Sequence, residues 1–80
     1  MTELAAHEDA ALEYTIVITH EQDGSWTASI EKLGVRESGA KDFEARSKAQ
    51  AHALRAIADQ VENDCSTPDK ISFVVILGRK

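Results

Sequence analysis

The side chains best suited to chemistry in this sequence are three histidines, one cysteine and fourteen acidic residues. His7, His20 and His52 are separated by 13 and 32 residues, which matches neither a zinc-binding spacing nor a His-x-x-x-His pair on one helix. The residues on either side of Cys65 supply no cation that would activate its thiol. We therefore expect neither a metal site nor a cysteine nucleophile.

Other routes to catalysis are also missing from the sequence. It has no glycine-rich phosphate loop, no serine nucleophile elbow and no Cys-His arrangement. Asp23, in a predicted turn, and Asp42 or Glu44, in a predicted strand, could approach each other as a carboxylate pair, but no pattern places them in a cleft. The sequence predicts no catalytic residue, no cofactor and no enzymatic activity.

Alternating residues predict a β-hairpin after an acidic arm. Residues 1–13 are rich in Ala and Glu, with few large apolar residues, and we expect them to form a flexible arm. From Tyr14 the chain alternates with period two, and it does so again from Ser25 to Ile30. Asp23-Gly24 between these segments supplies the chemistry of a tight turn.

A weaker strand and a helix are predicted to follow. Residues Val35 to Ala45 are expected to form a third strand with Phe43 as its only large apolar residue. Ser47 begins a Ser-x-x-Gln capping box, which predicts a helix from that residue. On a helical wheel one side is apolar and is expected to pack on the sheet, and it consists of Ala51, Leu54, Ile57, Ala58 and Val61.

The last predicted element is a strand from Ile71 to Leu77. Its run of β-branched residues is typical of an internal strand. The order is βββαβ, and the fold class is α+β: one sheet with a single amphipathic helix on one face. We expect one domain, residues 14–80.

The two faces of the predicted sheet differ in composition. The residues expected to meet the helix are Ile16, Ile18, Trp26, Ala28, Ile30, Phe43, Phe73 and Val75. Those expected on the opposite face are Thr15, Val17, Thr19, Thr27, Val74 and Ile76. Because no second helix is predicted to cover them, we interpret the second set as a partner or dimer interface.

Charge narrows the set of partners. The net charge of −5 opposes non-specific binding to phosphate backbones. Asp59, Glu62 and Asp64 stand where the helix dipole disfavours acids, so we expect them to meet a basic patch on a partner, with Glu21 and Asp23 extending the cluster. The alternative is that these acids only solvate the surface.

The expected location is the cytoplasm. The longest apolar stretch, Phe73 to Leu77, is far shorter than a membrane span, and the N-terminus lacks the pattern of a signal peptide. We therefore expect no membrane interaction.

Three strands followed by a helix that begins Ser47-Lys48 also resemble the second half of a double-stranded-RNA-binding domain. Such domains hold phosphates with a lysine cluster at the helix start. Here only Lys41, Arg46 and Lys48 are near, and the strand after the helix has no counterpart in that family. A divergent RNA-binding module is therefore a secondary alternative, and we do not expect nucleic-acid binding.

A fuller resemblance covers about residues 14–77. The segment Tyr14-Thr-Ile-Val-Ile, the segment Asp23-Gly-Ser-Trp-Thr-Ala-Ser-Ile-Glu-Lys-Leu33-Gly34 and the capped helix 47–62 resemble the HicB-like antitoxin domain. Where that family has Leu-Pro-Gly-Cys, this chain has Leu33-Gly34-Val35. The resemblance implies a partial ribonuclease-H-like fold without catalytic residues, which inhibits a small RNA-cleaving toxin by contact and dimerises through its sheet.

Two functions therefore stay open from the sequence. One is a non-catalytic antitoxin-like module that neutralises a partner protein by direct contact. The other is an inhibitor of the anti-CRISPR kind, which would present acids to a basic effector complex in place of nucleic-acid phosphates. Both need a protein partner.

Overall fold

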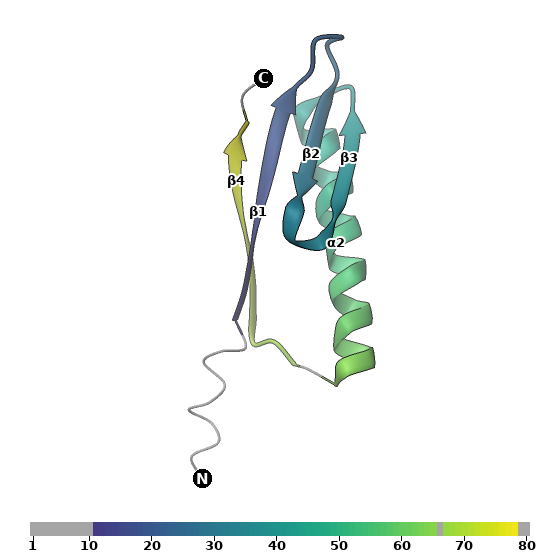
Figure 1. The fold of residues 1–80 in the computed structure, drawn as a ribbon, viewed down its shortest axis with the longest axis vertical. Helices are drawn as coiled ribbons and strands as arrows, with labels where there is room; N and C mark the ends of the chain where they lie inside the picture. Colours follow the sequence, from purple (N-terminus) through teal and green to yellow (C-terminus); the bar gives the residue numbers. More distant parts are fainter. Residues whose placement is uncertain (1–10, 66, 79–80) are drawn as a thin grey trace.

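The computed structural model describes residues 11–65 and 67–78, and these form one mixed four-stranded sheet with one α-helix packed on it (Figure 1). The predicted βββαβ order and the α+β class are confirmed for this part of the chain. The elements are β1 (Ala11–His20), β2 (Trp26–Ile30), the 3-10 helix η2 (Glu31–Leu33), β3 (Val35–Gly39), α2 (Asp42–Asp64) and β4 (Lys70–Leu77). The 3-10 turn η2 was not predicted.

Strand β1 is longer than the sequence indicates. It begins at Ala11, so residues 11–13, which were expected in the arm, belong to the sheet. The physical reason is that β4 pairs alongside them, with Ala11 opposite Lys70 and Leu12 opposite Ile71. Residues 1–10, the rest of the predicted arm, lie outside the described residues.

The predicted hairpin between β1 and β2 is present. Gly24 adopts a φ of 92°, a left-handed conformation that glycine tolerates without steric cost. The Glu21 amide donates to the Ser25 carbonyl over 2.8 Å and closes the turn. Opposite residues in the hairpin then share a face, as Ile18 and Ala28 do.

The third strand was predicted too long and the helix too short. Strand β3 ends at Gly39, and α2 begins at Asp42, so the Ser47 capping box lies inside the helix rather than at its start. Acidic residues Asp42 and Glu44 occupy the first turn, where the helix dipole favours them, and Glu44 Oε1 accepts a hydrogen bond from the Ala40 amide. Of the candidate carboxylate pair, Asp23 therefore lies in the hairpin turn, whereas Asp42 and Glu44 lie in the first turn of the helix and not in a strand.

A close backbone approach makes this early helix start possible. A Cβ added at Gly39 would lie 2.8 Å from the Cβ of Glu44 and 3.0 Å from the amide nitrogen of Ala45. Only a residue without a side chain lets β3 run directly into α2 at this distance. Phe43, predicted in the sheet core, is instead on the helix and 62% exposed.

The buried face of α2 matches the helical wheel only in part: Ile57 is buried and Val61 packs partly buried against the core, as expected. Leu54 is 44% exposed and Ala58 is exposed, whereas the buried residues recur every fourth position. They are Ala45, Ala49, Ala53 and Ile57. Three alanines let the helix backbone approach the sheet closely, so large side chains such as Leu54 point elsewhere.

The sheet side of the core agrees better with the sequence. Phe73 and Trp26 pack partly buried against the core, and Val75 is 36% exposed. The fully covered sheet residues are Tyr14, Ile16, Ile18, Ala28, Ile30 and Val35.

The strand order is β3-β2-β1-β4, and β4 runs parallel to β1 at one edge of the sheet. The prediction that β4 is internal is therefore wrong. Helix α2 packs mainly over β3 and β2, and Figure 1 shows it beside β3, with β4 at the opposite edge of the sheet. Among residues 11–65 and 67–78, the eight-residue strand β4 thus has a neighbouring strand on one side only.

Candidate binding surface

One face of the sheet gathers the six residues that the sequence assigned to an interface. Register places Thr15 opposite Val74, Val17 opposite Ile76, and Thr19 opposite Thr27. In a strand pair, opposite residues share a face, so these side chains are neighbours across three strands. We call this set of Thr15, Val17, Thr19, Thr27, Val74 and Ile76 the uncovered sheet face.

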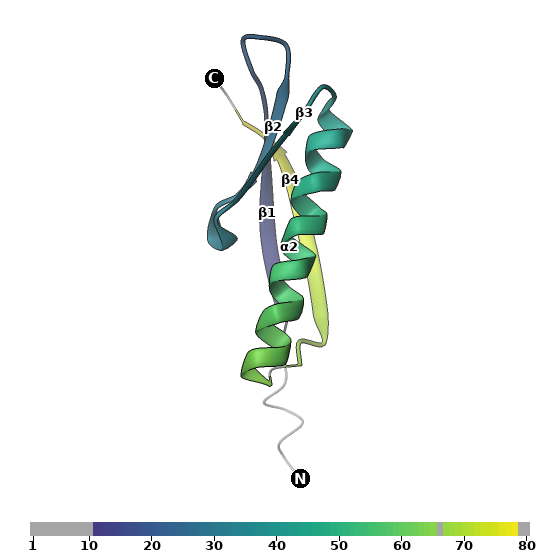
Figure 2. The ribbon, with the colours of Figure 1, turned by 90° about the vertical axis from the view of Figure 1, so that its right-hand side faces the viewer.

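The one α-helix among the described residues does not cover the uncovered sheet face, because α2 packs on the opposite side (Figure 2). Val74 is 41% exposed and Ile76 is 47% exposed. Val17 lies between Ile76 on one side and the neighbouring strand β2 on the other, and it is partly buried. The result is an apolar centre with threonines around it. Such a surface stays hydrated at a cost and favours a protein contact.

A hollow borders this face and was not predicted. Glu13, Glu31 and Lys32 line it together with Thr15 and Val17, and its volume is about 380 Å³. The 3-10 turn η2 contributes Glu31 and Lys32. The only sequence signal for that turn is Gly34, which adopts a φ of 67° directly after it.

Lys32 fixes η2 against strand β1. Its Nζ donates to the Glu13 carbonyl over 3.3 Å and lies 5.2 Å from the centroid of the Tyr14 ring. A cation over an aromatic ring is attracted to the ring's electron-rich face. Next to the hollow, the uncovered sheet face is therefore bordered by the Lys32 ammonium group and by the carboxylates of Glu13 and Glu31.

The five acidic residues assigned to one surface are not brought together. Asp59, Glu62 and Asp64 are exposed on the last turns of α2, which carry no basic residue in the final turn. Glu21 and Asp23 lie in the β1–β2 turn, at the other end of the molecule (Figure 1).

The acids of the hairpin turn have local partners. Asp23 Oδ1 accepts hydrogen bonds from the Ser25 hydroxyl at 2.6 Å and from the Ser25 amide at 2.9 Å. These bonds stabilise the carboxylate and hold the pKa of Asp23 below its ordinary value. Glu21 accepts a hydrogen bond from the Thr27 hydroxyl. Both acids thus serve the hairpin itself.

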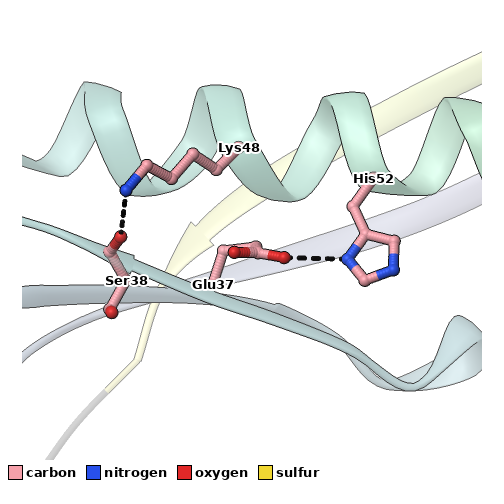
Figure 3. A network of polar contacts seen from close by, with 4 residues as sticks. All are labelled: Glu37, Ser38, Lys48 and His52. Carbon is pink, nitrogen blue, oxygen red and sulfur yellow. Dashed lines mark hydrogen bonds and ion pairs between the residues drawn. The ribbon is translucent and has the colours of Figure 1, made fainter.

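Two polar contacts join α2 to β3 (Figure 3). His52 Nδ1 lies 2.8 Å from Glu37 Oε2, and Lys48 Nζ donates to the Ser38 carbonyl over 3.1 Å. Within the described residues His52 makes no hydrogen bond to a hydroxyl or thiol. The His52–Glu37 pair therefore lacks the third member of a nucleophilic triad in this part of the chain.

The remaining candidates for chemistry occupy separate places. His20 stacks on Trp26 with ring centroids 4.1 Å apart, and Cys65 is exposed after the end of α2. His7 lies outside the described residues. Among the residues that the structure describes, no three His, Cys, Asp or Glu side chains are grouped to hold a metal ion.

A second apolar patch lies on α2. Phe43 and Leu54 are exposed and border a shallow hollow of about 450 Å³ with Arg46 and Gln50. Helical geometry places them on the opposite flank from Lys48, which contacts β3.

Comparison of the chain with protein-family models, with curated proteins and with solved structures finds no match. None of the helices in the described part of the chain has the length and apolar character to span a bilayer.

Proposed function

We propose that this chain is a non-catalytic binding module that acts on a partner protein by direct contact, with the uncovered sheet face as its contact surface. The observation that carries the proposal is the register that sets Thr15 and Val17 beside the exposed Val74 and Ile76. A partner would remove these apolar groups from water, at roughly 25 cal/mol per Å² of apolar area buried.

The class of partner follows from the resemblance to HicB-like antitoxins. The strand-turn-strand segment, the helix and the final strand occur in the order that this resemblance implies. A small RNA-cleaving toxin carries cationic groups that bind phosphate, and the chain's net charge of −5 would attract such a protein. The proposed activity is neutralisation of that toxin by occlusion.

The exposed acids at the end of α2 support a second candidate, an inhibitor that meets a basic effector complex electrostatically. Asp59, Glu62 and Asp64 stand at the negative end of the helix dipole, without a basic residue in the last turn to offset them. Their placement costs stability, and sequences accept such costs at functional sites.

One experiment separates the two candidates. The tagged full chain is expressed in its native host, the retained protein is identified and purified, and its affinity for single variants is measured. We expect Thr15→Lys and Val17→Lys to weaken binding at least tenfold. Leu54→Lys is the control, because Leu54, like Thr15, is exposed but lies on the helix instead of the sheet face.

The acids are tested with a triple change of Asp59, Glu62 and Asp64 to Asn or Gln. If the sheet face is the interface, this triple variant, whose net charge falls from −5 to −2 (−5 + 3), loses only part of the long-range attraction and binds far better than Thr15→Lys and Val17→Lys. Slower association and a flatter salt dependence in the triple variant, with wild-type binding by Thr15→Lys, would refute the proposal in favour of the electrostatic inhibitor.

A further inference from the structure

The two edges of the sheet differ in how they are protected against pairing with another strand. Strand β3 has only five residues, and it carries the charged pair Arg36 and Glu37. Strand β4 has eight residues, and its only charged residue is Lys70, at its first position. Natural sheets protect exposed edges with short strands, charges and proline, so β3 is protected whereas β4 is not.

Strand β4 exposes apolar side chains on both of its faces. Val74 and Ile76 belong to the uncovered sheet face, while Val75 and Leu77 lie on the side of α2 but beyond its cover. Leu77 is 74% exposed and Ile71 is 37% exposed. A long, apolar edge strand of this kind is a site for strand addition.

The backbone of β4 shows which of its groups are free to pair. The Gly78 amide donates to the Ile18 carbonyl over 2.7 Å, which directs the backbone of Gly78 toward β1. The backbone groups of successive residues point to alternate sides of a strand, so the residues one, three, five and seven positions before Gly78 point away from β1. The outward-pointing residues are Ile71, Phe73, Val75 and Leu77.

We propose that β4 pairs antiparallel with β4 of a second copy of this chain, so that two four-stranded sheets join into one of eight strands. A twofold axis perpendicular to the sheet keeps the equivalent faces of the two copies on the same side of the joined sheet. Odd-numbered residues of one β4 then lie opposite odd-numbered residues of the other, and even-numbered opposite even-numbered. The outward-pointing residues then meet outward-pointing residues, as an antiparallel ladder requires.

The register that pairs residues 71–77 of the two copies is centred on Val74. It sets Ile71 opposite Leu77 of the second copy and Phe73 opposite its Val75, with Val74 opposite Val74. Lys70 falls outside, opposite Gly78. Every apolar side chain of the strand thus gains an apolar or small neighbour.

Charge directs a second copy to this edge rather than to another surface. The net charge of −5 makes two copies repel each other over most of their surface, so a contact between copies must form where acids are absent. Strand β4 contains no acid, and bringing two copies of it together places no like charges opposite each other.

The pairing has a consequence for the proposed function, although it does not depend on it. Both α2 helices lie on one side of the joined sheet, and the uncovered sheet faces of the two copies become continuous through Val74. A strand-to-strand contact is smaller than a standard interface of about 800 Å² per partner, so we expect dissociation in the range of roughly 1–100 µM.

The test is the mass of the pure full-length chain by analytical ultracentrifugation between about 1 and 500 µM, a range that brackets this dissociation constant. We expect a concentration-dependent rise from 8.7 kDa toward twice that mass. Val75→Lys should raise the dissociation constant at least tenfold, since it adds an edge lysine on the side away from the uncovered sheet face. Leu54→Lys, off the edge, should dimerise as the wild type does.

The register is tested by cross-linking in a Cys65→Ser background. Val74→Cys should form a disulfide-linked dimer under mild oxidation. The two Val74 residues would form a non-hydrogen-bonded antiparallel pair, and the Cα atoms of such a pair lie about 4.5 Å apart. Arg36→Cys, on the β3 edge, is the control and should stay monomeric.

A wild-type chain that is monomeric throughout the concentration range overturns the proposal. So does a Val75→Lys chain that dimerises normally, or an Arg36→Cys chain that cross-links as fast as Val74→Cys. None of these results bears on the binding of a partner by Thr15 and Val17, which is measured separately.

Discussion

Replacing Leu54 and Ile57 with alanine tests which face of α2 is packed on the sheet. The helical wheel predicts that Leu54→Ala removes a core contact and costs roughly 2–5 kcal/mol. In the structure Leu54 is 44% exposed, whereas Ile57 is 3% exposed and belongs to the core. The helical wheel, which places both residues on the packed side, therefore predicts similar losses for the two variants, whereas the structure predicts a clearly larger loss for Ile57→Ala.

The expected magnitudes follow from burial. Full burial of a leucine side chain is worth about 1.5–3 kcal/mol, and little more than half of that applies to Leu54. Alanine also forms helices slightly better than leucine, so Leu54→Ala should cost about 0.5–1 kcal/mol. Ile57→Ala leaves a cavity in the core and should cost about 2–5 kcal/mol, out of roughly 4–12 kcal/mol expected for a domain of this size.

The assay is urea unfolding followed by far-ultraviolet circular dichroism, at one fixed protein concentration because dimerisation would make stability depend on it. Arg55→Ala is the surface control and should shift the free energy of unfolding by no more than about 0.5 kcal/mol. A loss for Leu54→Ala that equals or exceeds the loss for Ile57→Ala would refute the assignment of the helix face.

Two further predictions concern the ends of elements. Cys65 ends α2 with a φ of 53°, so Cys65→Gly should raise the free energy of unfolding by about 0.5–1 kcal/mol in urea titrations, and an unchanged or lower value would contradict this account of the cap. The hydrogen bonds from Ser25 lower the pKa of Asp23, so the carboxyl should titrate by NMR below the model-peptide value of about 3.9. The stabilisation it gives the hairpin is then present above that value and is lost as the pH falls through the folded-state pKa, and a midpoint at or above about 3.9 would rule this out.

The hairpin and the class of fold could be predicted because their signals are local. Period-two alternation from Tyr14 and the Asp23-Gly24 turn specify the β1–β2 pair without reference to the rest of the chain. The six residues of the uncovered sheet face followed directly, since alternation alone assigns each residue of a strand to one face.

The start and the buried face of the helix are harder to predict, because each of the two local signals is only partly right. The Ser47 capping box is a real start pattern, but the helix begins earlier, where Gly39 permits a close approach. The wheel gave weight to Leu54 because it is large. The recurrence of apolar residues at every fourth position from Ala45 to Ile57 is the stronger signal for the buried face.

The position of β4 shows what a sequence pattern does and does not specify. A continuous apolar run is typical of a parallel strand that is covered on both faces and paired on both sides. The run from Phe73 to Leu77 has that character, yet in the part of the chain that the structure describes only β1 lies beside it, and Leu77 is mostly exposed. Composition reports the environment to which a strand is adapted, and it does not report which chain provides that environment. The prediction of an internal strand was therefore wrong for one copy, and it would hold for the two-copy sheet in which a second β4 lies against the free edge.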